Sequence, residues 1–241
     1  MTVLENAYKE LFRAIHWEAE PFSVVECAEM HRNHWKPKQI KTLLLAESHV
    51  YTSAIENAVQ LHEELVSQTG CPNHFVKLVY CLGYGDNTVL NSKVLKNPGT
   101  WQYWELFRLA AEGATGLSFE KARTIDQKIS LLNTLKDNGV WLLDACPIGL
   151  YGSDPSGIEI KKAIRNYPEL MNICWETYTR PQIENCRPEK IILIGKMIWN
   201  NLHNKLSGWD CDWIYQPNAR QGKNYDFEHS PKTLKKRVMK V

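Results

Sequence analysis

The segment from Leu43 to Tyr51, with the sequence LLLAESHVY, decides the fold. Its apolar run stops abruptly at three polar residues, Glu47, Ser48 and His49. A buried parallel strand that ends in polar residues delivers them to the carboxyl edge of its sheet, where open α/β folds bind their ligands. We therefore expect a functional site to begin at Glu47.

Four further apolar segments predict strands of the same sheet. They are FVKLVYCL at 75–82, VWLLDA at 140–145, KIILIG at 190–195 and DWIYQ at 212–216. Helical patterns of apolar residues are expected at 4–15, 24–34, 53–67, 101–112, 122–138, 159–183 and 197–206. Because helices separate most of the strands, we predict an α/β fold, a three-layer αβα sandwich around a mostly parallel sheet of four to five strands.

Length and composition predict one globular domain. The chain has 241 residues, of which 44% are hydrophobic and 23% charged, and these are ordinary values for a globular protein. They argue against a disordered or fibrous chain. We expect a single α/β domain over 1–241, with an N-terminal helical extension at about 1–38 and a basic C-terminal tail at about 231–241.

Charge and cysteine usage limit the partners and the compartment. A formal net charge of +2 is too mild to demand a polyanionic partner. The seven cysteines form no CxxC pair and no His/Cys cluster at metal spacing, so we predict reduced thiols, no metal site and no cofactor. Without an apolar leader or a long apolar segment, we expect a cytoplasmic protein with no membrane contact, and a monomer as the default.

Polar residues also close the later strands. Asp144 ends the apolar run VWLLDA, and a charge there is unfavourable unless it is paired or faces a site. Gln216 and Asn218 follow the last expected strand. Because the carboxyl ends of parallel strands meet at one edge, we expect these residues to converge with Glu47.

In the order of these parts, the chain resembles the uracil-DNA glycosylase superfamily over roughly residues 40 to 230. The stretch LLLAESHVY stands where that family has its water-activating motif, and NGVWLLDA looks like the strand whose last polar residue contacts the base. The stretch IILIGKMIWNNL is similar to the strand and helix before the last motif. The stretch IYQPNARQG stands in place of the His-Pro-Ser loop that enters the minor groove.

The resemblance implies hydrolysis of the N-glycosidic bond of an altered base in DNA. Glu47 or Asp144 would activate or orient water, and His49 or Gln216 would donate a hydrogen bond to the departing base. The expected substrate-binding residues are Ser48, His49, Tyr51, Tyr84, Trp101 and Asn218, and Arg220 and Lys223 suit DNA phosphates.

Alternatives remain open at the same positions. Ser48 stands where the most active members have Asp, and Gln216 replaces a His, which favours a non-catalytic protein that binds nucleic acid or a nucleotide. A small-molecule α/β enzyme would use the same sheet edge. Glu47 would otherwise form a structural ion pair with Lys41 or Lys196, and Ser48 would cap the next helix. A Ser48–His49 nucleophile pair is disfavoured because adjacent strand residues point to opposite faces.

Overall fold

The computed structural model describes residues 1–116, 124–217 and 229–238. The chain divides into two compact units, each assembled from separate stretches of sequence. The first, here called the sheet unit, consists of Trp35–Ala46, Trp101–Leu143 and Cys186–Val241. The second, here called the helical unit, consists of Met1–His34, Glu47–Thr100 and Asp144–Asn185. The chain therefore passes from the sheet unit to the helical unit directly after Ala46 and again directly after Leu143.

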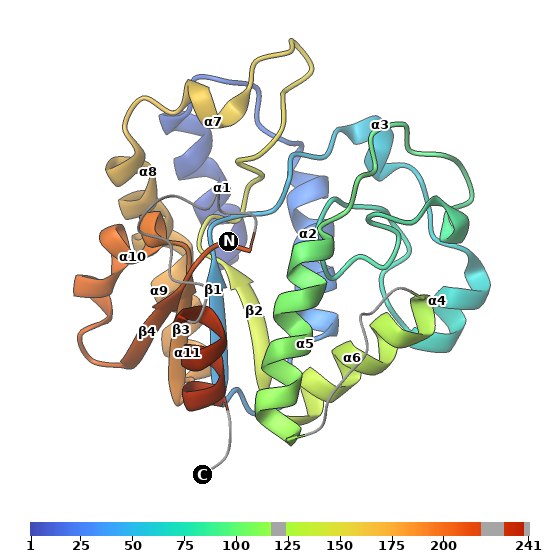
Figure 1. The fold of residues 1–241 in the computed structure, drawn as a ribbon. Coiled ribbons are helices and arrows are strands. Elements are labelled where there is room, and N and C mark those ends of the chain that lie inside the picture. The colour runs from blue at the N-terminus through green and yellow to red at the C-terminus, as the bar shows by residue number, and fades with distance from the viewer. Residues whose placement is uncertain (117–123, 218–228, 239–241) are drawn as a thin grey trace. The chain divides into compact units, whose positions relative to one another are not determined.

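A parallel sheet is the centre of the sheet unit. Among the described residues it has four strands in the order β2-β1-β3-β4, as Figure 1 shows. Their bounds are Thr42–Ala46 for β1, Val140–Asp144 for β2, Lys190–Ile194 for β3 and Asp210–Ile214 for β4. Thr42 pairs with Lys190, and Lys190 pairs with Asp210, which sets the register. Every residue of β1, an inner strand, and of β2, an edge strand, is buried, as is typical of parallel strands.

The strand expected at 75–82 was wrong, and this leaves four strands rather than five. Successive backbone bonds, Leu78 N–H to Val76 O and Cys81 N–H to Leu78 O, fold the segment into tight turns. Phe75, Val76 and Leu82 are fully buried there. The apolar run therefore fills the core of the helical unit as a loop, and its composition alone does not distinguish that loop from a strand.

Four α-helices of the sheet unit lie within the described residues. They are α5 at Trp101–Thr115, α6 at Ile125–Asp137, α10 at Lys196–Leu202 and α11 at His229–Val238, with a 3-10 turn η3 at His203–Leu206. Helix α10 packs on β3 and β4, α11 packs on β4 and α5, and α5 packs on α6. Arg237 in α11 forms ion pairs with Asp210 and Asp212 of β4, so the described part of the basic tail is a docked helix.

The helical unit contains the N-terminal helices and the segments that follow β1 and β2. Its helical elements are α1 at Val3–Ala14, α2 at Phe22–His34, α3 at Ala54–Asn57, α4 at Glu63–Thr69, η1 at Asn87–Val89, α7 at Ile160–Ala163, α8 at Tyr167–Cys174, the π-helix η2 at Trp175–Thr179 and α9 at Arg180–Cys186. The helix expected at 53–67 is divided because Gln60 and Leu61 form β-bridges with His74 and Leu90. Ser53, rather than Ser48, caps the helix that follows β1.

Within the described ranges, no helix is both long and apolar enough to cross a membrane.

Gly139 joins α6 to β2 in a conformation that favours glycine. Its φ is +75°, and a Cβ added there would lie 2.9 Å from the carbonyl oxygen of Gln39 and 3.1 Å from the backbone nitrogen of Lys41. Its carbonyl accepts hydrogen bonds from the backbone N–H groups of Lys41 at 2.8 Å and Thr42 at 3.1 Å. Gly139 therefore fixes how β1 and β2 begin side by side.

We expect Gly139→Ala to lower the free energy of unfolding by about 2–4 kcal/mol, because the new Cβ meets backbone atoms and the left-handed conformation becomes strained. Gly208→Ala is the matched control, since a Cβ at Gly208 would meet no atom within 4 Å. That change should stay within about 0.5 kcal/mol. Urea denaturation of both variants measures the difference, and equal shifts would contradict the assignment.

Candidate active site

The residues that follow β1 run beside the residues that follow β2, inside the helical unit. The backbone N–H of Cys146 donates to the carbonyl of Glu47 at 2.9 Å. The hydroxyl of Ser48 accepts from the N–H of Leu150 at 3.0 Å and donates to the carbonyl of His49 at 3.1 Å. Ser48 therefore ties two chain segments together, and its hydroxyl has partners on both sides.

A buried network of charged side chains surrounds His49 and Asp144. The guanidinium of Arg32, on α2, donates to Asp144 Oδ2 at 2.5 Å and to Glu29 Oε2 at 3.2 Å. His49 Nε2 lies 3.0 Å from Glu20 Oε2, and His49 Nδ1 lies 3.0 Å from Arg32 Nη2. The Arg32 and Asp144 side chains are only 1% and 3% exposed. The network therefore carries alternating charges away from water, where each must be paired.

Each end of this network holds a loop in place. Glu20 accepts hydrogen bonds from the backbone N–H groups of Thr52 at 2.5 Å and Gly149 at 2.8 Å. At the other end, Glu29 accepts from the Tyr178 hydroxyl at 2.7 Å and from the Gln182 amide at 3.2 Å. The carboxylates therefore position the segments after β1 and β2 and connect them to α2 and α9.

The pairing shifts the pKa values of the two central groups. Burial alone would raise the pKa of Asp144, but the charges and hydrogen bonds of Arg32 and His49 outweigh it and hold that pKa below its usual range. Burial alone would lower the pKa of His49, but the Glu20 carboxylate and the hydrogen bonds to Asp144 and Glu20 outweigh it and raise that pKa. A neutral ring accepts from Arg32 at Nδ1, whereas a protonated ring points its Nδ1–H toward Asp144, 3.7 Å away.

This environment gives Asp144 and His49 a structural role. Asp144 was expected to act on water, and His49 to donate a hydrogen bond to the base, and these catalytic roles stay predictions. Both side chains are buried, and Asp144 Oδ2 and both ring nitrogens of His49 have partners within the network. The two residues hold the two loops together.

Glu47 has a different environment, with a partner that reaches solvent. Its carboxylate accepts a hydrogen bond from the Tyr151 hydroxyl and forms an ion pair with Lys161 Nζ, from α7. Lys161 Nζ lies 5.1 Å from the ring centre of Tyr151 and 4.7 Å from that of Tyr167. We call these four residues the Glu47 cluster. An ion pair at Glu47 was one of the expected alternatives, but its partner is Lys161 and not Lys41 or Lys196.

The Glu47 cluster combines a carboxylate with an amine of altered basicity. The side chain of Glu47 is 5% exposed and that of Lys161 is 27% exposed. Burial lowers the pKa of Lys161 to about 8. The Tyr167 hydroxyl is buried without a hydrogen-bond partner among the described residues, and burial raises its pKa. Such a cluster can accept and deliver protons near neutral pH.

The other predicted site residues lie elsewhere. Tyr51 and Tyr84 are core residues of the helical unit, each 4% exposed, so neither ring has a face free to stack on a base. Trp101 and Gln216 belong to the sheet unit, and Trp101 is 65% exposed. The remaining predicted residues, Asn218, Arg220 and Lys223, lie outside the described residues.

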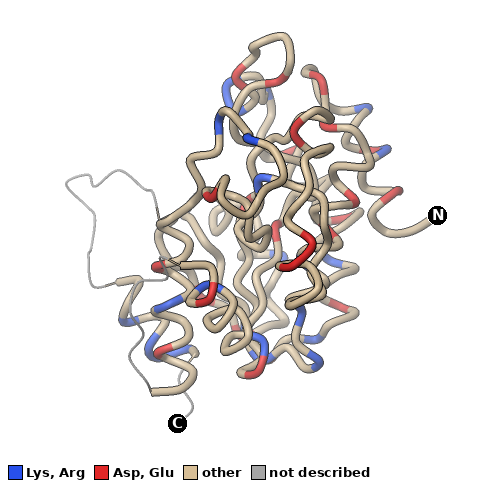
Figure 2. The backbone as a smooth tube through the Cα atoms, turned by 90° about the vertical axis from the view of Figure 1, so that its right-hand side faces the viewer, with Lys and Arg blue, Asp and Glu red and all other residues tan. Residues whose placement is uncertain are grey.

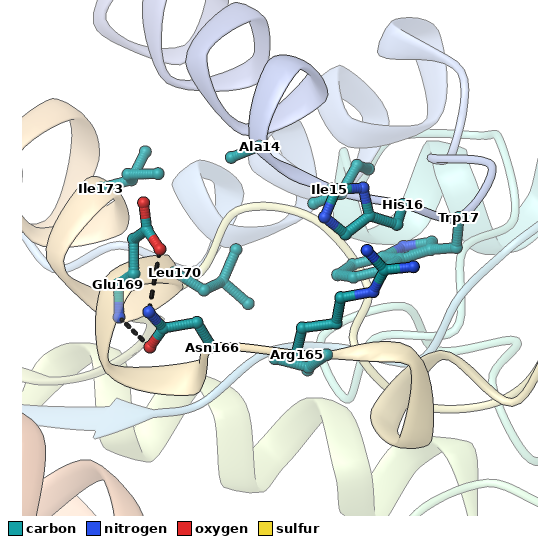
Figure 3. Close-up of a pocket in the computed structure, with 10 residues that line it drawn as sticks. Ala14, Ile15, His16, Trp17, Arg165, Asn166, Glu169, Leu170 and Ile173 are labelled. Carbon is teal, nitrogen blue, oxygen red and sulfur yellow. Dashed lines mark hydrogen bonds between the residues drawn. The ribbon is translucent and has the colours of Figure 1, made fainter.

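A cleft of about 270 Å³ in the helical unit involves none of the predicted site residues. Figure 3 shows Asn166 and Glu169 hydrogen-bonded at one side of it, with His16, Trp17 and Arg165 at the other. The Asn166 amide donates to Glu169 Oε2 at 2.9 Å, so that carboxylate already has a partner. The cleft shares no lining residue with the Glu47 cluster.

Burial disfavours the thiolate form of Cys27, Cys81 and Cys146. All seven cysteines are free, and burial raises the pKa of Cys27 to about 11 and that of Cys81 to about 12. Cys146, which follows β2, is fully buried, and its pKa is also raised. Among the described residues, no group of three or more His, Cys, Asp and Glu side chains is arranged to hold a metal ion.

Sequence reasoning missed Glu20, Arg32, Tyr151 and Lys161. Arg32 lies in an ordinary helical pattern, and its ion pair with Asp144 spans 112 positions. Lys161 stands beside Lys162 in a charged stretch of the sequence, yet the two side chains are 27% and 79% exposed. The sequence offered one weak signal, the Gly/Ser/Pro-rich loop before α7, which predicts an irregular segment but no partner.

We expect Asp144→Asn to lower the free energy of unfolding by about 3–5 kcal/mol, because it leaves the buried charge of Arg32 without its closest counter-charge. Glu10→Gln is the control, since it removes the partner of an exposed arginine, Arg13, from a 2.7 Å ion pair. That change should cost about 0–1 kcal/mol. Denaturant midpoints of the two variants give the comparison, and a small effect at Asp144 would refute the structural role.

The pKa of His49 gives stability a dependence on pH. Because its folded pKa is raised above the ordinary 6.5, its contribution is fully present below that value and is lost as pH rises through the folded pKa. The lowered pKa of Asp144 acts oppositely, and its contribution is lost as pH falls through that folded pKa. We expect His49→Gln to remove the decline on the alkaline side and keep the acid decline. Unfolding free energies measured from pH 3 to 9 test this, and an unchanged alkaline limb would contradict it.

The resemblance seen in the sequence stays a prediction. A scan against protein-family models and a search of curated proteins both gave no match to this sequence. What supports a function is therefore the chemistry of the residues after β1 and β2.

Proposed function

We propose that this protein is a DNA glycosylase with a fold of the uracil-DNA glycosylase type, which hydrolyses the N-glycosidic bond of an altered base. One observation carries the proposal. Glu47 presents a nearly buried carboxylate directly after β1, held by the Tyr151 hydroxyl and the Lys161 ammonium. The parallel sheet, with polar residues after β1 and at the end of β2, supports a three-layer sandwich of this type.

The chemistry of base release suits such a carboxylate. Breaking the bond develops positive charge on the sugar and negative charge on the base, so a fixed anion near the sugar stabilises the transition state. The same carboxylate orients the attacking water and takes its proton. Lys161 pairs with Glu47 and is itself 27% exposed, so the pair is not sealed within the core.

DNA is the proposed partner. The altered base must leave the base stack of the DNA before its bond is cleaved, and this costs a few kcal/mol. Figure 2 shows basic and acidic positions interspersed along the described chain. Helix α11 is more basic, with Lys235 and Lys236 in its last turn. Together with the predicted phosphate residues Arg220 and Lys223, it supports contact with the DNA backbone.

A second candidate is a protein that binds nucleic acid without turnover. Both carboxylate oxygens of Glu47 already have donors, one from Tyr151 and one from Lys161. The amide of Gln216 cannot carry a charge near neutral pH, so it stabilises a departing base less than a His would. Salt-dependent binding of DNA without release of any base distinguishes this candidate from the first.

The decisive experiment incubates the protein with oligonucleotides that carry uracil, hypoxanthine or xanthine, and detects abasic sites by strand cleavage in hot alkali. We expect release of at least one base, and a rate lower by about 10²–10⁴ in Glu47→Gln, which removes the charge and the proton acceptor. Glu159→Gln is the control because Glu159 forms an exposed ion pair with Lys162. It should retain full activity.

Two results would overturn the proposal. The first is the absence of abasic sites from all substrates with folded protein, and the second is an unchanged rate in Glu47→Gln.

A further inference from the structure

We propose that Lys161 is an amine nucleophile, which forms a Schiff base with the aldehyde of an abasic deoxyribose and cleaves the DNA strand by β-elimination. This inference rests on the proposed function for its substrate class, because the abasic site is the product of base release. It assigns to the Glu47 cluster a second reaction that follows the first.

The surroundings of Lys161 differ from those of an ordinary surface lysine. Its side chain extends from α7 to the buried carboxylate of Glu47, with the rings of Tyr151 and Tyr167 at 5.1 and 4.7 Å from Nζ. Its side chain is 27% exposed, so the lysine is only partly buried. The neighbouring Lys162 is 79% exposed and pairs with Glu159 at 2.7 Å on the surface. The fold therefore selects one of two adjacent lysines for a confined position.

Confinement also supplies the reactive form of the amine. Burial lowers the pKa of Lys161 to about 8, so near that pH about half of the side chains are neutral. A lysine at its ordinary pKa of about 10.4 is almost entirely protonated there. A desolvated lysine beside a proton acceptor is a general way to activate an amine toward a carbonyl carbon.

The cluster holds groups for each proton that the reaction moves. Glu47 lies against Nζ and accepts the ammonium proton, which leaves the electron pair of the amine free to attack. The Tyr151 hydroxyl, bonded to the other carboxylate oxygen, holds Glu47 in place. The two tyrosine rings stabilise a cation at Nζ through their π faces, and this applies to the iminium as well as to the ammonium.

The reaction balances without an oxidant, a reductant or a further reactant. The neutral amine adds to C1′ of the open-chain sugar, and the carbinolamine loses its hydroxyl as water, with the proton that Glu47 had accepted from the ammonium, to give an iminium and restore the Glu47 carboxylate. A base, for which Glu47 is positioned, removes a proton from C2′, and the C3′–O bond breaks with its electron pair leaving on the phosphate oxygen. Water then adds to the imine, which releases the unsaturated aldehyde and restores Lys161.

Borohydride trapping on a preformed abasic site tests this inference independently of base release. The protein is mixed with an oligonucleotide that carries one abasic site, sodium borohydride is added, and the adduct is measured by its slower migration. Peptide mapping by mass spectrometry then locates the modified lysine. We expect the adduct at Lys161 and an increase in its yield between pH 7 and pH 8.5, as the amine loses its proton.

Lys161→Arg keeps the positive charge and the ion pair but cannot form the imine, so adduct yield and strand cleavage should fall at least about tenfold. Lys162→Arg is the matched control and should leave both unchanged. Circular dichroism spectra and unfolding midpoints like those of the unaltered protein show that the variants are folded. An adduct that maps to another amine, an equal yield in Lys161→Arg, or no adduct in the unaltered protein would overturn the inference.

The two proposals fail in different ways. Base release with an intact, untrapped abasic strand supports the glycosylase and refutes the lyase. Adduct formation at Lys161 without release of any tested base supports the lyase and refutes the glycosylase.

Discussion

The ion pair of Arg32 with Asp144 is the interaction on which the rest of the helical unit depends. A guanidinium whose side chain is 1% exposed has no water to solvate it, so its charge requires carboxylates within hydrogen-bond distance. Asp144 and Glu29 meet that requirement, and His49 connects Asp144 to Glu20. This demand for pairing holds α2 and the segments after β1 and β2 in one arrangement.

That arrangement separates structural carboxylates from reactive ones. Asp144 and Glu20 are both held by buried partners, and moving either toward a substrate would leave a charge unpaired. Glu47 follows β1 just two residues before His49, yet its partner is a lysine that reaches solvent. A partner at the surface is released at less cost than a buried one, because water can solvate it. Of the three carboxylates Asp144, Glu20 and Glu47, Glu47 is therefore the one suited to reaction.

The sequence predicted the strands at 42–46, 140–144 and 190–194 well, because an apolar run that stops at a polar or glycine residue is typical of a buried parallel strand. The same signal was wrong at 75–82, where an apolar run fills a core as turns. Glu47 was found because it follows β1 directly. Arg32 and Lys161 were not, because their partners lie 112 and 114 positions away and only the folded chain brings them together.

The pairing of Glu47 with Lys161 also explains how one cluster can serve two steps. Burial disfavours the charged form of the lysine and lowers its pKa to about 8. In the proposed base release, the proton stays on Lys161, and Glu47, paired with that ammonium, supplies the negative charge near the sugar. In the proposed strand cleavage, the deprotonated amine is the nucleophile for the aldehyde. Transfer of a single proton within the cluster therefore changes its chemistry from electrostatic stabilisation to covalent attack.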